Sequence, residues 1–182
     1  NQNIESLVIG YFVSAQAVGL YQTFKKLVSP IAIAVQPLAM LAYPKMIRYF
    51  EEGTTSKIQH LVVNVTKFVL MFSIAFILSI SLLLEPILNI MELEFERSHL
   101  YYFFAMSLTM VFAAMQWWAR PFANTVNPMY SVNINLFSTI YQVLVLATFA
   151  YIWGVLGVIW ALFILQLSLV FVWFYLGKKY VS

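Results

Sequence analysis

The segment from Lys57 to Ile90 reads KIQHLVVNVTKFVLMFSIAFILSISLLLEPILNI and determines how the rest of the chain is interpreted. It is a long apolar run that is interrupted only late, at Glu85-Pro86. About 20 apolar residues are enough for a helix to cross the hydrocarbon core of a bilayer. We therefore predict a membrane-spanning helix over residues 57–90.

The composition of the whole chain is typical of an integral membrane protein. Of its 182 residues, 63% are hydrophobic and 9% are charged, whereas a soluble domain carries about 25% charged residues. The chain has no cysteine, which excludes disulfides and thiol chemistry. Because it starts at Asn1 rather than Met and shows no signal-peptide pattern, we expect its natural N-terminus to lie upstream.

We predict an all-α, polytopic transmembrane bundle that forms one lobe over residues 1–182. The expected elements are the end of one helix (1–13) and five spans (20–50, 57–90, 99–123, 129–153 and 155–177). A turn is expected over residues 14–19. Three prolines, at 30, 37 and 44, lie inside the first full span, where proline is tolerated and usually bends the helix.

The basic residues predict the sidedness of the bundle. If the spans alternate, one side receives Lys45, Arg48, Lys57, Arg120, Lys178 and Lys179. The opposite side receives the turn at 14–19, the loop at 92–97 and the turn at Gly154, with Arg97 as its only basic residue. By the positive-inside rule the first side is cytoplasmic. We therefore expect a multi-pass protein of the cytoplasmic membrane with a cytoplasmic C-terminus.

Polar residues recur at helical spacing in four of the predicted spans. They are Gln22, Ser29, Gln36 and Tyr43; His60, Asn64 and Lys67; Thr109, Gln116, Arg120 and Asn124; and Ser131, Asn135, Ser138 and Gln142. Such spacing places each set along one line of its helix. Four polar lines indicate a shared polar interior. The alternative is that these groups hydrogen-bond from helix to helix, which requires no cavity.

Cations inside apolar segments need a stronger explanation, because a charge near the bilayer centre costs at least about 2.5–3.5 kcal/mol. Lys67 lies ten residues beyond Lys57, and no carboxylate is near it in the sequence, which contains no Asp. Lys25 and Lys26 are nearer the outer end, where snorkelling of the side chain is an equal alternative. Unpaired cations favour an anionic substrate, such as a phosphate or pyrophosphate group. The candidate substrate-binding residues are Lys67, Arg120, Lys25, Lys26, Gln116 and Asn64.

Other functional classes have little support in the sequence. His60 and His99 lack the spacing of metal ligands, and the chain contains no phosphate-binding Gly-rich loop and no Ser/His/Asp set. We expect no metal, no cofactor, no catalytic residue and no nucleic-acid partner.

Several short stretches resemble a known transporter family. They are IESLVIGYF (4–12), AVGLY (17–21), LAYPK (41–45) and WGVLGV (153–158). Together they are similar to the C-terminal half of Wzx-type oligosaccharide flippases of the MOP superfamily, whose relatives include the MATE antiporters. Glu5 stands where the family usually has Asp, which is a mild departure.

The resemblance implies the end of helix 7 and helices 8 to 12 of a twelve-helix transporter. Such a protein has two lobes around a cationic cavity and moves polyprenyl-pyrophosphate-linked oligosaccharide across the membrane by alternating access. The implied partners are this substrate, membrane lipid and the missing N-terminal lobe. One alternative is a MATE-type drug or cation antiporter, which usually needs intramembrane carboxylates. Another is a membrane enzyme acting on lipid-linked sugars, which should have a large outer loop. A purely structural subunit would leave Lys67 unexplained.

Overall fold

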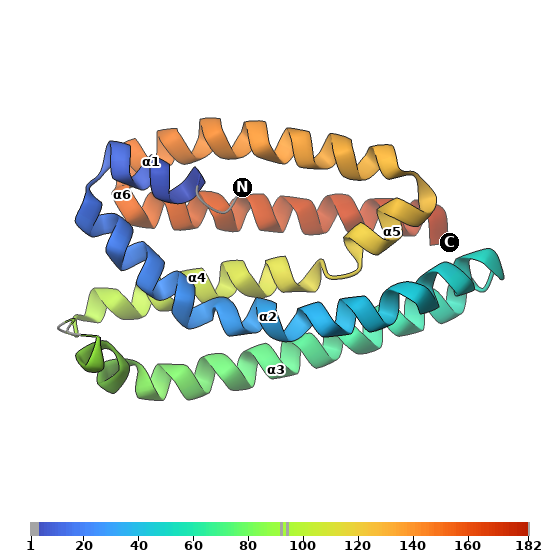
Figure 1. Cartoon of the computed structure of the whole chain (residues 1–182), viewed down its shortest axis with the longest axis horizontal. Helices are drawn as coiled ribbons and strands as arrows, with labels where there is room; N and C mark the ends of the chain where they lie inside the picture. Colours follow the sequence, from blue (N-terminus) through green and yellow to red (C-terminus); the bar gives the residue numbers. More distant parts are fainter. Residues whose placement is uncertain (1–3, 92, 94, 182) are drawn as a thin grey trace.

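The computed structural model describes residues 4–91, 93 and 95–181, and these form an all-helical bundle (Figure 1). The helices are α1 (Ile4–Phe12), α2 (Ala15–Glu51), α3 (Thr55–Ile90), α4 (Arg97–Met115), α5 (Ala119–Val126) and α6 (Pro128–Val181). No strand occurs in the part of the chain that the structure describes. The prediction of an all-α fold is confirmed.

Helix α2 begins five residues earlier than predicted. Ser14 has an extended backbone, and its Oγ accepts a hydrogen bond from the Ala17 N–H at 3.0 Å. This is the geometry of an N-cap, which satisfies one of the free N–H groups of the first turn. The predicted turn over 14–19 is therefore wrong, because residues from Ala15 onward are helical. Pro30, Pro37 and Pro44 all lie within this one continuous helix.

The predicted span 99–123 is not one helix. It is divided into α4 and α5 by a turn at Gln116, Trp117 and Trp118. The Gln116 N–H donates to the Ala113 oxygen rather than four residues back, which tightens the end of α4. The chain then re-forms a helix at Ala119, so Arg120 lies in the first turn of α5 and not near the end of a single span.

Helix α6 contains a reversal at Gly154, whose φ of 60° and ψ of −140° are not helical. The first arm (128–153) and the second arm (155–181) lie side by side in Figure 1 and run in opposite directions. A Cβ at Gly157 would lie 2.1 Å from the Phe149 oxygen, so the backbones touch here. The two arms correspond to the last two predicted spans.

The connections gather at two opposite ends of the bundle (Figure 1). The α2–α3 turn, the α5–α6 junction and the C-terminus lie at one end, and the α1–α2 turn and the α3–α4 connection lie at the other. Gly154 belongs to this second end, because it lines one hollow together with Ser14 and Leu93. Of the predicted acidic loop at 92–97, Glu92 and Glu94 lie outside the described residues, and Arg97 begins α4. This grouping is what spans of alternating direction require.

Four helices are long and apolar enough to cross a membrane: α2, α3, the α4–α5 segment and α6. Large apolar side chains cover their outer surface, among them Met71, Leu82 and Phe137, which are 72%, 83% and 68% exposed. So large an apolar surface is incompatible with water and fits lipid contact. The chain is consistent with a multi-pass membrane protein. The count of five spans stays a prediction.

The core consists of two large hydrophobic clusters and a small third one formed by Ala119, Ala123 and Trp173. One large cluster lies near the Gly154 end and includes Tyr21, Phe24 and Phe103. The other large cluster includes Val35 and Trp117 and lies near the α5 end. The packing leaves hollows between the helices at this second cluster, and the predicted polar lines meet there.

Candidate binding site in the helix bundle

A cavity of about 430 Å³ lies between α2, the α4–α5 break and both arms of α6. We call it the central pocket. Its polar lining consists of Gln36 from α2, Gln116 and Arg120 from the break and α5, and Asn135 and Ser138 from the first arm of α6. Three of the four predicted polar lines therefore meet in one cavity. None of the described residues that line it is acidic.

Gln116 is held in place at the wall of this pocket. Its Nε2 donates to the Gln166 Oε1 at 2.9 Å, to the Gln166 oxygen at 3.2 Å and to the Phe112 oxygen at 3.1 Å. These contacts tie the end of α4 to the second arm of α6, and they occupy the amide nitrogen. Gln116 therefore has a structural role, and its side chain also lines the pocket. Gln166 was not predicted, because it belongs to no polar line in the sequence.

Two polar atoms beside the pocket have no hydrogen-bond partner among the described residues. They are the buried Ser138 Oγ and Gln142 Oε1, four residues apart on the first arm of α6. A buried polar atom left unpaired costs about 1–3 kcal/mol, so such groups usually meet water or a ligand. One helical turn towards the α5 end, Asn135 donates only a long bond of 3.5 Å to the Ser131 Oγ. This polar wall has capacity to hydrogen-bond a ligand.

Arg120 is the only cation among the described residues that line the central pocket, and its side chain is exposed. Arginine remains charged under all physiological conditions and offers five N–H donors in a planar fork. A guanidinium in an apolar layer with polar neighbours and no lining carboxylate is suited to bind an anion.

Lys67 does not line the central pocket. It lines a hollow of about 290 Å³ together with Thr66 and Leu70 of α3 and with Trp173 and Phe174 of α6. This hollow shares Val62, Val63, Trp118 and Phe174 with a second one of about 310 Å³, which contains Gln59 and Lys178. We call the two together the α3–α6 groove. Gln116 and Trp173 line both the groove and the central pocket and separate Lys67 from Arg120.

The remaining predicted site residues lie elsewhere. Lys25 forms an ion pair with Glu5 at 3.1 Å, and its Nζ lies 5.6 Å from the centroid of the Tyr21 ring. Lys26 is exposed on α2, and Asn64 is exposed on α3 and lines neither the pocket nor the groove. Lys25 therefore has a carboxylate partner, which the sequence analysis missed because Glu5 is twenty residues away.

His99 has a structural role. The Glu96 N–H donates to its Nδ1 at 3.2 Å, and Glu96 and His99 together form a capping box at the start of α4. Its ring also lies 5.6 Å from the Phe24 ring. The described residues contain no group of three His, Cys, Asp or Glu side chains that could hold a metal ion.

Comparison with protein-family models, with curated proteins and with solved structures found no match to this chain. The functional interpretation therefore depends on the pockets themselves and on the chemistry of the residues that line them.

Proposed function

We propose that this chain is one lobe of a membrane transporter that flips a polyprenyl-pyrophosphate-linked oligosaccharide across the cytoplasmic membrane by alternating access. The observation that carries the proposal is the central pocket. An arginine and polar side chains from α2, α4 and α6 converge between apolar helices, and no carboxylate lines the cavity.

The chemistry of the pocket fits the two parts of such a substrate. The Arg120 guanidinium can bind a pyrophosphate oxygen pair through two parallel N–H donors. Gln36, Asn135 and Ser138 can exchange hydrogen bonds with sugar hydroxyls, which both donate and accept. Binding of this kind requires no covalent step, so the proposal assigns no catalytic residue and no cofactor.

Transport in this proposal needs a second lobe. A single lobe supplies one wall of a transport path, and alternating access arises when two halves rock around a shared site. The resemblance to Wzx-type flippases implies that the second wall is an N-terminal lobe of the same protein. Lys67 and Arg120 line separate hollows in this structure, so the proposal rests on Arg120, and contact between Lys67 and the substrate stays a prediction.

A MATE-type antiporter is the second candidate, and the Glu5–Lys25 pair favours it. Glu5 is only 12% exposed and lies between α1 and α2, where an exchanged proton or cation could compete with Lys25. If Glu5 coupled transport to an ion gradient, Glu5→Gln would abolish transport as fully as Arg120→Gln. The flippase proposal expects Glu5→Gln to act on stability instead.

The test compares Arg120 variants of the full-length protein with its parent. Each is reconstituted in vesicles that contain a fluorescent polyprenyl-pyrophosphate oligosaccharide. Arg120→Gln removes the charge and should lower the flipping rate about tenfold or more, since hydrogen bonds to charged groups are the strong ones. Arg120→Lys should retain part of the rate. Arg97→Gln, an exposed cation at the start of α4, is the matched control. Parental flipping by a well-folded Arg120→Gln would overturn the proposal.

A further inference from the structure

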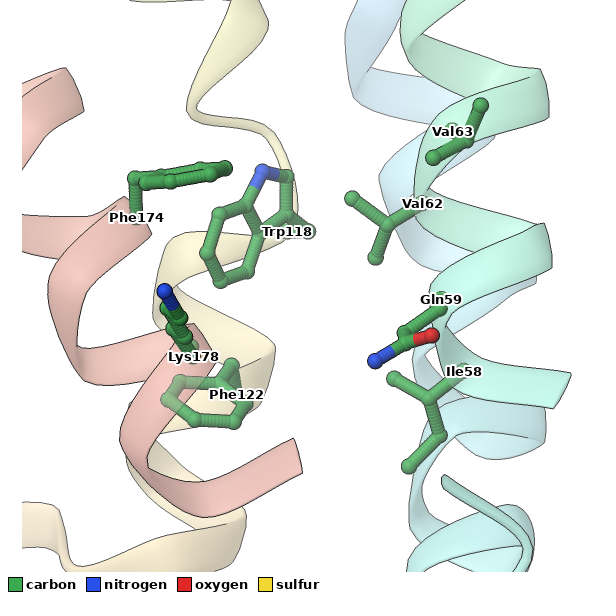
Figure 2. Close-up of a pocket in the computed structure, with 9 residues that line it drawn as sticks. Ile58, Gln59, Val62, Val63, Trp118, Phe122, Phe174 and Lys178 are labelled. Atoms are coloured by element: carbon green, nitrogen blue, oxygen red, sulfur yellow. The ribbon is translucent and has the colours of Figure 1, made fainter. Parts of the chain in front are cut away.

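The α3–α6 groove is open to the lipid-facing surface and runs along the helix axes. Figure 2 shows the part of the groove near Lys178, where Ile58, Gln59, Val62 and Val63 of α3 face Trp118, Phe122, Phe174 and Lys178 across a gap. Val63 and Phe174 are 48% and 69% exposed, so the gap is not closed by protein on its outer side. Its walls are almost entirely apolar.

The groove continues past Val63 towards the middle of the bundle. This second part is lined by Leu70 of α3, Met115 of α4 and Val170 of α6. From Ile58 to Leu70 it follows twelve residues of α3, which is about 18 Å at about 1.5 Å per residue. A long, narrow, apolar channel parallel to the helices has the shape of an extended acyl chain.

Two lysines give the groove its charge. Lys178 lines the same part of the groove as Gln59, and Lys67 lines the second part, about 12 Å further along α3 than Gln59 at about 1.5 Å per residue. A lysine at this depth extends its flexible stem towards the interface, which brings its ammonium group closer to Lys178. None of the described residues that line the groove is acidic. The rings of Trp118 and Phe122 pack edge-to-face in the part of the groove that Lys178 lines, and tryptophan is enriched at membrane interfaces.

We infer that the α3–α6 groove binds one anionic glycerophospholipid from the leaflet at the Lys178 end. An acyl chain lies along Leu70, Met115 and Val170, and the phosphate sits between the ammonium groups of Lys67 and Lys178. Basic pockets between membrane helices recognise acidic head groups in this way. The apolar walls exclude a free inorganic anion as the occupant, since it would gain nothing from them. This site is separate from the central pocket and does not depend on the proposed transport function.

Native mass spectrometry of the purified chain in neutral detergent tests the inference. The probes are phosphatidylglycerol and phosphatidylcholine with identical acyl chains, and the readout is the binding constant of the first lipid. The parent should bind phosphatidylglycerol about 25-fold more tightly, because each of the two lysines near the head group contributes about fivefold. Lys67→Gln/Lys178→Gln should remove this preference, and each single variant should lower it about fivefold.

The matched control is Lys45→Gln/Lys57→Gln, which removes two exposed charges at the same end of the bundle but outside the groove. It should leave the preference unchanged. Val63→Phe fills the groove without changing the charge and should weaken both lipids. Equal binding of the two lipids by the parent, or an equal loss in the control pair, would overturn the inference. So would displacement of phosphatidylglycerol by millimolar inorganic phosphate, which would indicate a simple anion site. If the double variant fails to fold, the two single variants decide the question.

Discussion

Gly154 is the residue at which the longest helix of the chain reverses. Its φ of 60° with ψ of −140° lies where an L side chain is strained, at a cost of about 1–3 kcal/mol. We expect Gly154→Ala to lower the apparent melting temperature of the detergent-solubilised chain. Gly19→Ala is the control: a Cβ there meets nothing within 4 Å, and the residue is helical, so the substitution should be neutral or slightly stabilising. Equal effects of the two substitutions would show that the reversal at Gly154 is not a tight structural constraint.

Glu5 and Lys25 join α1 to α2 by an ion pair whose side chains are 12% and 25% exposed. Removing one partner of a poorly hydrated pair leaves an uncompensated charge, which costs more than removing both. We therefore expect Glu5→Gln and Lys25→Gln each to lower the melting temperature, and the double substitution to recover part of the loss. The double-mutant cycle should give a coupling of about 0.5–3 kcal/mol. Additive losses would argue against this contact.

The break between α4 and α5 shapes both the central pocket and the α3–α6 groove. Gln116 lines both of them, and Trp118 lines the groove. Gln116→Ala removes the donor to Gln166 and leaves half-buried acceptors unpaired, which costs about 1 kcal/mol. The melting temperature should fall accordingly. Asn64 is exposed on α3 and lines neither the central pocket nor the groove. Asn64→Ala should therefore leave the melting temperature unchanged. A stable Gln116→Ala variant would mean that the break is held by packing alone.

Pro121 is a local signal for this break, because it has no N–H to donate to the Trp117 oxygen four residues back and is tolerated in the first turn of a helix. It does not by itself predict the hydrogen bonds that hold residues 116–118. What stabilises the break is tertiary: Gln116 bonds to Gln166, fifty residues away, and the Trp117 Nε1 donates to the Thr66 Oγ1 at 3.2 Å. The reversal at Gly154 was predicted because its signal is local, in the pair Gly154 and Gly157. The local signal at Gly154 gave the right position, whereas the start of α2 was predicted five residues too late and contacts between distant residues were not predicted.

The polar lines of the sequence were a partial guide to the site. They correctly brought Gln36, Gln116, Arg120, Asn135 and Ser138 to one cavity, because the spacing fixes which residues share a helix face. They did not show which neighbour each face packs against. For that reason Lys67 was grouped with Arg120, although α3 turns it towards the second arm of α6. The Glu5–Lys25 pair was missed for the same reason.

At the scale of the whole molecule, the two ends of the bundle should lie on opposite sides of the membrane. Reporter fusions after Glu52 and Asn127 should report the cytoplasm, and fusions near Ala15 and Gly154 the outside. The basic residues at the α2–α3 end support this orientation by the positive-inside rule. The inverted pattern would contradict the sidedness and, with it, the resemblance to a flippase lobe.

The central claim is that the bundle contains a hydrated pocket that holds an anion at Arg120. The chain has no native cysteine, so Ser138→Cys introduces a single thiol on the wall of that pocket. The measurement is its rate of modification by membrane-impermeant thiol reagents of opposite charge, with Val143→Cys, 47% exposed on the same arm, as the lipid-facing control. Reaction requires water and the thiolate.

We expect Ser138→Cys to react faster with the anionic reagent than with the cationic one. Arg120→Gln should abolish this preference, and pyrophosphate-linked lipid should protect the thiol. Modification of Ser138→Cys no faster than that of Val143→Cys, by either reagent and from either side, would contradict the central claim.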